Sequence, residues 1–571
     1  MPSASRRTLL AAALAVPVTA GCGAPSKEPE PAGPVAPSTP SADPAAPDDP
    51  AARAAALVAT LADEDLAGQV LMPFAYGDSA TEVSAGSAAR NRELAGVDTP
   101  AQMVEKYRLG GLILVGFSAD DPTAANQVTT NVDNPQQVRG LTDGLHTAAG
   151  KLPAGAAPLL IGIDQEYGVV TRITKGVTLL PGALAAGAAG KAELTENAWR
   201  AAGAELAAMG VNLDFAPVAD VLVGRSAVIG SRSFGGDPEL VGAQVSAAVR
   251  GLQAAGVAAT LKHFPGHGHT SADSHHELPT LTQKRAVLAS EAWGPFRAGV
   301  AAGAELVMSA HLDVRAVDPG VAATFSRKLL TDVLRGELGF TGVVVTDGMN
   351  MAPAQKYPAG EAAVRALNAG NDLILMPPNV TQAYDGVLAA LRDGSLPRER
   401  LVAAATRILT LKFRLAATPA PPLTVLGDDA HRAAARALAL AAVTVLRGSC
   451  AGLAVDGGVR VTTSAGRDRT RELLTGELAA AGVPVVTRGG TVVHLVGYGD
   501  GTADLNAEAD VTVAMDTPHL LARAASPVLL ATYSSSPASM TALAQVLAGR
   551  EEAKGRLPVE VAGLPATTCK P

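Results

Sequence analysis

Between residues 51 and 417, eight short apolar runs alternate with alanine-rich stretches long enough to form helices. The runs are Gln69–Phe74, Gly111–Gly116, Pro158–Asp164, Val211–Val218, Val257–His263, Glu305–His311, Gly342–Asp347 and Asp372–Met376. Continuous apolar runs that alternate with helices are typical of parallel strands buried on both faces. Eight strand–helix units are the number that closes a (β/α)8 barrel. The pattern therefore predicts an α/β fold with a TIM barrel over residues 51–417.

Polar side chains stand inside or just after the ends of many of these runs. They are Asp164, Asp214, Lys262, His263, His311 and Asp347. In a TIM barrel the active site lies at the carboxyl ends of the strands. A polar residue after a strand can also be the cap of the next helix. Capping does not account for acidic and basic groups at so many run ends, so we expect an active site there.

The remainder of the chain predicts a second, smaller domain. A proline-rich linker covers residues 418–424, and residues 425–571 read as a second α/β domain. Its expected strands are Ala441–Leu446, Val459–Thr463, Val485–Thr487, Val492–Val496, Val511–Val513 and Val528–Thr532. These runs carry no comparable cluster of reactive side chains. We therefore expect the C-terminal domain to be a stabilising or docking domain rather than a catalytic one.

The N-terminus reads as an export signal over residues 1–21. Ser5–Leu10 has the twin-arginine pattern, and the apolar stretch that follows, of about a dozen residues, is shorter than the 20 or so that span a bilayer. Thr19–Cys22 resembles a bacterial lipobox, which predicts a lipid anchor on Cys22; the alternative is ordinary signal cleavage. Residues 22–50 are rich in proline and predict a disordered tether. The protein is thus expected to be exported, either secreted or held on the outer face of the cytoplasmic membrane through lipid alone.

Composition and cysteine content exclude several functions. The net charge of −8 gives no basic field, so nucleic acid is not an expected partner. No Cys-x-x-Cys is present, which argues against thiolate zinc sites and redox dithiols. Cys450 and Cys569 could pair in an oxidising compartment, or one could be buried and the other exposed. The sequence indicates no oligomeric state.

Residues 262–276 hold five of the ten histidines of the chain. A metal site is one interpretation, but two glycines and a proline indicate a mobile loop, and the spacing fits no zinc motif. A histidine-rich loop without a function is another. The third is catalytic: in Asp273-x-His275 the carboxylate can hold one imidazole nitrogen and leave the other for acid–base chemistry.

Asp347 follows a buried valine run and precedes Gly348. A carboxylate at a strand end, beside a residue that lets substrate approach, suits a nucleophile. A lone aspartate in this place is by default a helix cap. The Asp-x-His loop in the same barrel favours the nucleophile.

Together these motifs resemble glycoside hydrolase family 3, and the Asp-Ser-His loop resembles its β-N-acetylhexosaminidase branch. The matching segments are Ile163–Glu166, Asn212–Val218, Ser231–Gly235, Lys262–Gly268, Asp273–His275, Leu278–Pro279, Val307–His311, Thr346–Met351 and, more loosely, Ala442–Arg447 and Gly555–Val559. One departure stands out. Where the family usually reads Asp-Gln-Glu-Gly-Gly-Arg, this chain has Tyr167 and Val169 at the first glycine and the arginine.

The resemblance implies that residues 425–571 form the family's smaller α/β sandwich domain. It also implies roles for single residues. Asp347 would be the nucleophile, His275 the acid/base and Asp273 its orienting partner. The contacts to the hydroxyls and acetamide of N-acetylglucosamine would come from Asp164, Arg172, Arg232, Lys262 and His263. Neither a metal nor another cofactor is implied.

The implied activity is that of a retaining exo-β-N-acetylglucosaminidase, a β-N-acetylhexosaminidase that hydrolyses terminal N-acetylglucosamine from glycans. The expected location outside the cytoplasmic membrane suggests cell-wall peptidoglycan fragments as the substrate. A neutral imidazole does not repel an anion, so a phosphorylase is one alternative. A β-glucosidase or xylosidase of the same family is another, and a non-enzymatic alternative is a sugar-binding lipoprotein.

Overall fold

The computed structural model describes residues 49–116, 129, 131–450 and 457–569. The signal segment 1–21 and Cys22 lie outside the described residues. The first helix, α1 (Pro50–Val58), has Pro50 at its start, and the Asp49 carboxylate accepts hydrogen bonds from Ala51 and Ala52. Residues 49 and 50 therefore cap and begin a helix, whereas the sequence assigned them to the tether.

The predicted barrel is confirmed, because each of the eight runs contains one strand of a closed parallel ring. The strands are β1 (Leu71–Met72), β2 (Gly111–Leu114), β3 (Leu160–Ile163), β4 (Leu213–Asp214), β5 (Ala258–Phe264), β7 (Leu306–Ser309), β9 (Val343–Thr346) and β10 (Ile374–Leu375). Six of them, from β2 to β9, form one continuous sheet, and β1 pairs with β10. Backbone hydrogen bonds from Thr346 to Leu373 and from Ile113 to Pro73, both 3.0 Å, close the ring.

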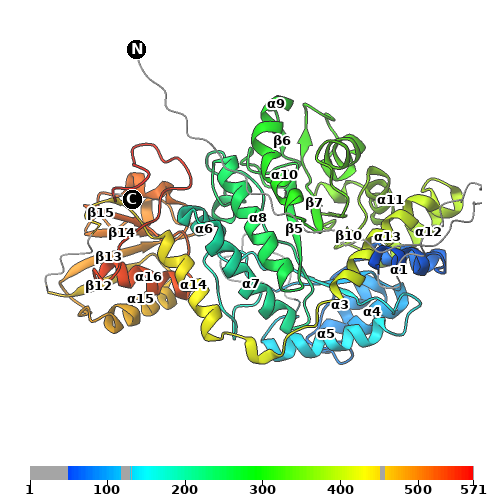
Figure 1. Ribbon diagram of the computed structural model, residues 1–571, viewed down its shortest axis with the longest axis horizontal. Coiled ribbons are helices and arrows are strands. Elements are labelled where there is room, and N and C mark those ends of the chain that lie inside the picture. Colours follow the sequence, from blue (N-terminus) through cyan, green and yellow to red (C-terminus); the bar gives the residue numbers. More distant parts are fainter. Residues whose placement is uncertain (1–48, 117–128, 130, 451–456, 570–571) are drawn as a thin grey trace, which may run out of the picture. The chain divides into compact units, whose positions relative to one another are not determined.

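Helices with apolar inner faces connect the strands. They include α2 (Asp63–Gln69), α3 (Ala85–Ala95), α4 (Pro100–Tyr107), α5 (Pro135–Ala149), α6 (Ala183–Ala189), α7 (Ala192–Ala208), α8 (Pro238–Ala254), α10 (Gly294–Ala301), α11 (Ala359–Ala369), α12 (Val380–Asp393) and α13 (Arg398–Leu415). In α8 the Asp237 side chain caps the first turn and a proline starts it, the usual arrangement at a helix N-terminus. Figure 1 shows α7 and α8 packed side by side outside the barrel strands.

A short extra pair of strands anchors the histidine-rich loop. β6 (Thr280–Leu281) pairs in parallel with β8 (Asp313–Val314), which follows β7. The loop over residues 265–279 thus leaves the end of β5 and is fastened again at β6. Its middle therefore lies over the carboxyl ends of the strands.

The C-terminal domain has a five-stranded sheet in the order β11-β15-β14-β13-β12, parallel except for β11. Its elements are α14 (Asp429–Ala442), β11 (Thr444–Arg447), β12 (Val459–Thr463), α15 (Asp468–Ala480), β13 (Thr491–Val496), β14 (Val511–Ala514), β15 (Val528–Ala531) and α16 (Pro537–Leu547). The strand expected at Val485–Thr487 is wrong, because only Val485 makes an isolated bridge, to Val459. Helix α14 packs against α6 and α7 of the barrel.

Two further features complete the fold. The Cys450 and Cys569 side chains form a disulfide, which decides the alternative that the sequence left open. None of the described helices combines the length and the apolar character needed to cross a membrane.

Candidate active site

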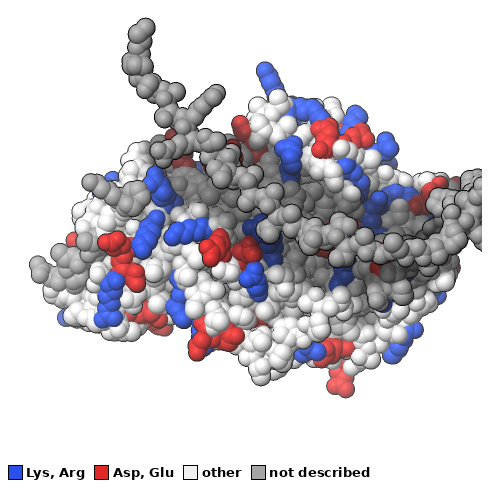
Figure 2. Space-filling model, viewed as in Figure 1, with Lys and Arg blue, Asp and Glu red and all other residues white. Residues whose placement is uncertain are grey.

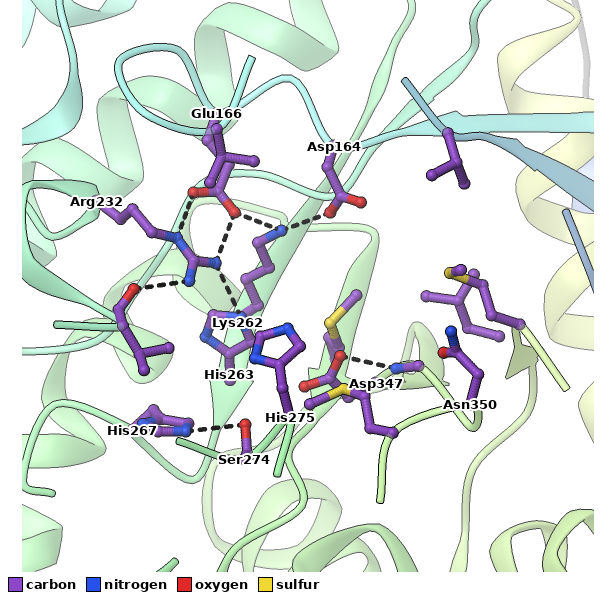
Figure 3. A pocket seen from close by; sticks show the side chains of 18 of the residues that line it. Asp164, Glu166, Arg232, Lys262, His263, His267, Ser274, His275, Asp347 and Asn350 are labelled. Carbon is purple, nitrogen blue, oxygen red and sulfur yellow. Dashed lines mark hydrogen bonds and ion pairs between the residues drawn. The ribbon is translucent and has the colours of Figure 1, made fainter. Parts of the chain in front are cut away.

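A pocket opens at the carboxyl ends of the barrel strands, and seven of the eight expected catalytic and sugar-binding residues line it (Figure 3). They are Asp164, Arg172, Arg232, Lys262, His263, His275 and Asp347. The eighth, Asp273, stands behind His275. Residues almost 200 positions apart in the sequence thus meet at one edge of the ring, as the strand-end pattern predicts.

Asp273 fixes the ring of His275. One carboxylate oxygen, Oδ1, lies 2.7 Å from Nδ1 of His275 and also accepts a hydrogen bond from the His275 backbone, at 2.9 Å. Burial raises the pKa of Asp273, but the hydrogen bonds from His275 outweigh it and hold the pKa below its ordinary value. An ionised Asp273 places the ring proton on Nδ1 and leaves Nε2 for acid–base exchange in the pocket.

Asp347 follows β9 and presents its carboxylate beside His275 (Figure 3). Its Oδ1 accepts a hydrogen bond of 2.7 Å from the Gly348 backbone. Burial raises the pKa of Asp347, whereas the neighbouring imidazoles of His263, His311 and His275 and the Gly348 N–H lower it, and the lowering prevails. An ionised carboxylate beside an imidazole is the pair of groups that a double displacement requires.

A network of alternating charges forms another wall of the pocket. The Lys262 ammonium lies 2.8 Å from Asp164 and 2.7 Å from Glu166, and the Arg232 guanidinium holds both oxygens of Glu166 at 2.8 Å. Burial raises the pKa of Glu166, but Arg232 and Lys262 outweigh it and bring the pKa to about 2. For Lys262 burial lowers the pKa, and Asp164 and Glu166 raise it above the ordinary value. Glu166 and Lys262 are therefore both charged at neutral pH.

Arg172 closes this network beside Asp164, with 3.5 Å between Nη2 and the Asp164 Oδ2. Burial and the positive charge of Arg232 lower the pKa of Arg172 to about 10, so it too stays charged at neutral pH. Fixed donors and acceptors of this kind can bind several sugar hydroxyls at once.

Sequence reasoning missed several residues that organise the site. Glu166 pairs with Arg232 and Lys262, and Asp220 accepts from the ring of His263 at 2.7 Å. Asp220 lies two residues after the run that contains β4, so the strand-end rule, extended by two positions, finds it. The pairing of Glu166 with Arg232 spans 66 residues and has no local signal.

His267 and Ser274 form a hydrogen bond within the histidine-rich loop, residues 265–279. Nε2 of His267 lies 3.1 Å from the Ser274 hydroxyl, and the His267 backbone donates to Asp220 at 2.7 Å. Burial lowers the pKa of His267 to about 4, so its ring is neutral. Ser274 stands between Asp273 and His275 in the chain, and this bond therefore helps to position both of them.

Two of the polar run ends do not reach the pocket. Asp214 is buried within the barrel, and burial raises its pKa well above the ordinary value. His311 lies under Asp347, with 3.0 Å between its Nε2 and the Gly348 carbonyl oxygen, so it supports the turn that carries the carboxylate. Among the described residues no three histidine, cysteine, aspartate or glutamate side chains are grouped to hold a metal ion.

The departure at Tyr167 and Val169 leaves the pocket intact. Tyr167 has a φ of 64°, a conformation that glycine adopts without cost, and its buried ring packs edge-on against Trp199 with 5.8 Å between centroids. Neither Tyr167 nor Val169 lines the pocket, whereas Asp164 and Arg172 on either side both do.

Comparison with known proteins agrees with this geometry. The glycosyl hydrolase family 3 N-terminal domain matches residues 82–411. A β-hexosaminidase of Alkalilimnicola ehrlichii is 40% identical over 294 residues, which cover 50% of this chain and 78% of that protein. β-Hexosaminidase A of Pseudoalteromonas piscicida is 34% identical over 379 residues, which cover 61% of each protein, so the chain spans less than two thirds of that relative. The solved structure of a family 3 β-N-acetylglucosaminidase from a Paenibacillus species superposes with a TM-score of 0.75 at 31% identity, over 89% of this chain and 100% of that one.

Proposed function

The chain belongs to glycosyl hydrolase family 3, and from that premise we propose that it is a retaining exo-β-N-acetylglucosaminidase. The observation that carries the proposal is the arrangement of Asp347 beside the Asp273–His275 pair in one pocket. The names of the relatives support N-acetylhexosamine as the sugar.

The geometry supports a two-step reaction. The Asp347 carboxylate attacks the anomeric carbon while His275 Nε2 gives its proton to the departing glycosidic oxygen, so a glycosyl ester forms and the C–O bond to the aglycone breaks. His275 then takes a proton from water, which displaces Asp347 and restores both groups. Asp273 remains ionised throughout and stabilises the imidazolium. Asp164, Lys262 and Glu166 form a wall of the pocket, and a pocket walled in this way supports exo action on a terminal sugar.

Hydrolysis of 4-nitrophenyl N-acetyl-β-glucosaminide, compared with the corresponding glucoside, tests the proposal. We expect selective turnover of the N-acetyl substrate and a fall in kcat of at least about a thousandfold in Asp347→Asn. Asp318→Asn, which alters an aspartate paired with Lys328 near the surface, is the matched control and keeps activity. Preferred turnover of the glucoside assigns a β-glucosidase, and sugar binding without turnover assigns the sugar-binding lipoprotein.

His275→Ala separates acid catalysis from structure. 4-Nitrophenolate leaves without protonation, so the first step with that substrate loses little rate, whereas cleavage of the methyl glycoside falls by about 100- to 10,000-fold. Equal losses of cleavage rate on the 4-nitrophenyl and methyl glycosides would contradict the role of His275 as the acid. The same assay in phosphate buffer tests the phosphorylase alternative, because a phosphorylase releases N-acetylglucosamine 1-phosphate and a hydrolase does not.

We also propose that the enzyme is exported, tethered through a lipid on Cys22, and acts on peptidoglycan fragments. The twin-arginine pattern and the lipobox-like Thr19–Cys22 support this. Incorporation of labelled fatty acid, lost in Cys22→Ala, tests the anchor. Release of N-acetylglucosamine from purified muropeptides tests the substrate, and failure to cleave them while chitin fragments are cleaved contradicts it.

A further inference from the structure

A cavity of about 610 Å³ lies between the barrel and the C-terminal domain, behind the segment 164–173 that follows β3. Tyr167 and Thr171 line it from the barrel, and the first residues of α15 and α16 line it from the other domain. Among the described residues, none lines both this cavity and the catalytic pocket. The cavity is therefore a separate space, and its volume suits a small molecule.

The lining of the cavity is positively charged. It includes two arginines and six serine or threonine side chains, and none of its described residues is acidic. The Arg467 guanidinium is paired with Asp500 at 3.1 Å. Arg469 is exposed, and no carboxylate of the described residues forms an ion pair with it. The whole chain has a net charge of −8, so an uncompensated cation in a cavity favours an anionic ligand.

The backbone is strained on both sides of the cavity. Tyr167 has a φ of 64°, and Tyr533, which precedes the lining residue Ser534, has a φ of 57°. Side chains other than glycine rarely adopt this conformation, and residues held in it gather at ligand sites and switches. Position 167 is also one where this chain differs from the usual family motif. The strained wall is therefore a feature of this chain.

The segment after β3 is a wall shared by the cavity and the catalytic pocket. Glu166 and Arg172 line the pocket, whereas Tyr167 and Thr171 line the cavity. The Gln165 side-chain oxygen accepts a hydrogen bond from the Arg172 backbone at 2.9 Å, which closes the segment into a compact turn. A ligand that holds one side of this turn therefore also holds the side that binds the sugar.

We propose that the cavity binds a small anionic molecule whose phosphate or carboxylate group contacts Arg469. The apolar part of that molecule packs on Leu179, Leu180 and Leu473, which also line the cavity. Its binding stabilises the strained segment after β3 and thereby tightens sugar binding at Arg172. The binding site goes beyond the proposed function, whereas its effect on turnover rests on that function.

Isothermal titration of the purified protein with three ring compounds tests the ligand class. Phenyl phosphate, benzoate and benzamide each carry one phenyl ring and differ in the charged group. At least one of the two anions is expected to bind about tenfold more tightly than benzamide. Preference for phenyl phosphate assigns a phosphate ligand, and preference for benzoate assigns a carboxylate. Equal binding of all three compounds, or no binding of either anion at millimolar concentration, overturns the site.

Arg469→Gln locates the binding in the cavity. Loss of the charged hydrogen bonds is expected to weaken binding of the preferred anion by about 5- to 20-fold. Arg471→Gln is the matched control, because Arg471 also belongs to α15 but pairs with Asp468 at 2.9 Å and does not line the cavity. It should leave the affinity unchanged. Equal losses in the two variants would reflect general charge attraction and overturn the site.

The same titration in saturating N-acetylglucosamine separates the cavity from the catalytic pocket, which also contains arginines. An anion in the cavity should then bind about fivefold more tightly, and saturating anion should tighten N-acetylglucosamine binding by the same factor. Weaker anion binding in the presence of the sugar means competition in the catalytic pocket and overturns the cavity site. Unchanged affinities overturn the coupling.

Turnover of 4-nitrophenyl N-acetyl-β-glucosaminide is measured in parallel. The preferred anion should lower KM in the wild type and in Arg471→Gln, but not in Arg469→Gln, and leave kcat unchanged. Absence of turnover, with anion binding that Arg469→Gln weakens, contradicts the proposed hydrolase and leaves the anion site supported. Turnover without anion binding overturns only the anion site.

Discussion

Two lysines of the barrel are equally buried and have opposite acid–base behaviour. Lys262 in β5 and Lys412 in α13 are each 2% exposed. Lys262 stands between Asp164 and Glu166, which raise its pKa above the ordinary value. Lys412 lies at the amino end of the ring, where its ammonium donates to the Gln69 side-chain oxygen at 2.8 Å, and burial lowers its pKa to about 7.

The difference shows that burial alone does not determine whether a charge survives. An amide oxygen stabilises an ammonium less than two carboxylates do, so the lysine at the amino end loses most of its affinity for a proton. At the carboxyl end, in contrast, the opposite charges around Lys262 and Glu166 keep both of these groups ionised. On the face shown in Figure 2, surface charges of both signs are interspersed. The difference between the amino and carboxyl ends of the barrel therefore lies in the buried groups around Lys412 and Lys262.

Removing Lys262 should have the largest effect. Lys262→Met leaves Asp164 with the more distant Arg172 alone and Glu166 with Arg232 alone. We expect the free energy of unfolding to fall by about 3–5 kcal/mol. We also expect kcat/KM to fall by at least about 100-fold. Urea denaturation and hydrolysis of the 4-nitrophenyl substrate measure the two effects. Wild-type stability in this variant would falsify the claim that the network is tightly coupled.

Removing Lys412 should raise the free energy of unfolding, whereas removing Lys262 should lower it. Below pH 7 the folded and unfolded states both hold the proton, and the folded state bears the whole cost of the buried ammonium. Between pH 7 and the unfolded value near 10.5 only the unfolded state is protonated, so the stability of the wild type rises with pH. Lys412→Met is therefore expected to be about 4 kcal/mol more stable at pH 6 and to lose this advantage by pH 10.5. A variant less stable than wild type at pH 6 contradicts this account.

Glu166 provides the corresponding test in acid. Its pKa is about 2 in the folded state and 4.5 when unperturbed, so its contribution is complete above pH 4.5 and is lost as the pH falls toward 2. Glu166→Gln should lower the free energy of unfolding by about 3 kcal/mol at pH 7 and by about half that at pH 3. The measurement is urea denaturation at both pH values, and a loss that does not depend on pH counts against the ionised pair.

The smallest change should come from giving Lys412 a carboxylate. Gln69→Glu reproduces at the amino end the pairing seen around Lys262. The gain in attraction and the cost of burying a second charge nearly cancel, so stability at pH 7 should stay within about 1 kcal/mol of wild type. The rise in stability between pH 7 and 10.5 should disappear. Its persistence would show that the lysine stays neutral beside a carboxylate.

The barrel could be predicted because buried parallel strands appear in a sequence as continuous apolar runs. Every run from Gln69–Phe74 to Asp372–Met376 contains one strand. The two-residue strands β6 and β8 lie outside these runs, so the pattern did not predict them. The run at Val485–Thr487 does not pair along its length with another strand. Its apolar character alone therefore led to a wrong strand prediction.

The site could be predicted in its residues but not in its pairings. Strand-end positions and the Asp-x-His loop indicate Asp347 and His275, because both signals are local. The two hydrogen bonds between the Arg232 guanidinium and the Glu166 carboxylate depend on the closed ring, and no local sequence pattern predicts them. Lys412 sits in the last turn of α13, where a lysine usually faces solvent, and only the structure shows its burial.

Trapping the covalent intermediate tests the central claim most directly. A 5-fluoro N-acetylglucosaminyl fluoride forms the glycosyl ester and slows its hydrolysis, so peptide mass spectrometry can locate the modified residue. The account predicts a single adduct on Asp347, absent from Asp347→Asn and preserved in Asp318→Asn. An adduct on another carboxylate, or rapid turnover that releases the inverted anomer with no adduct, would contradict it.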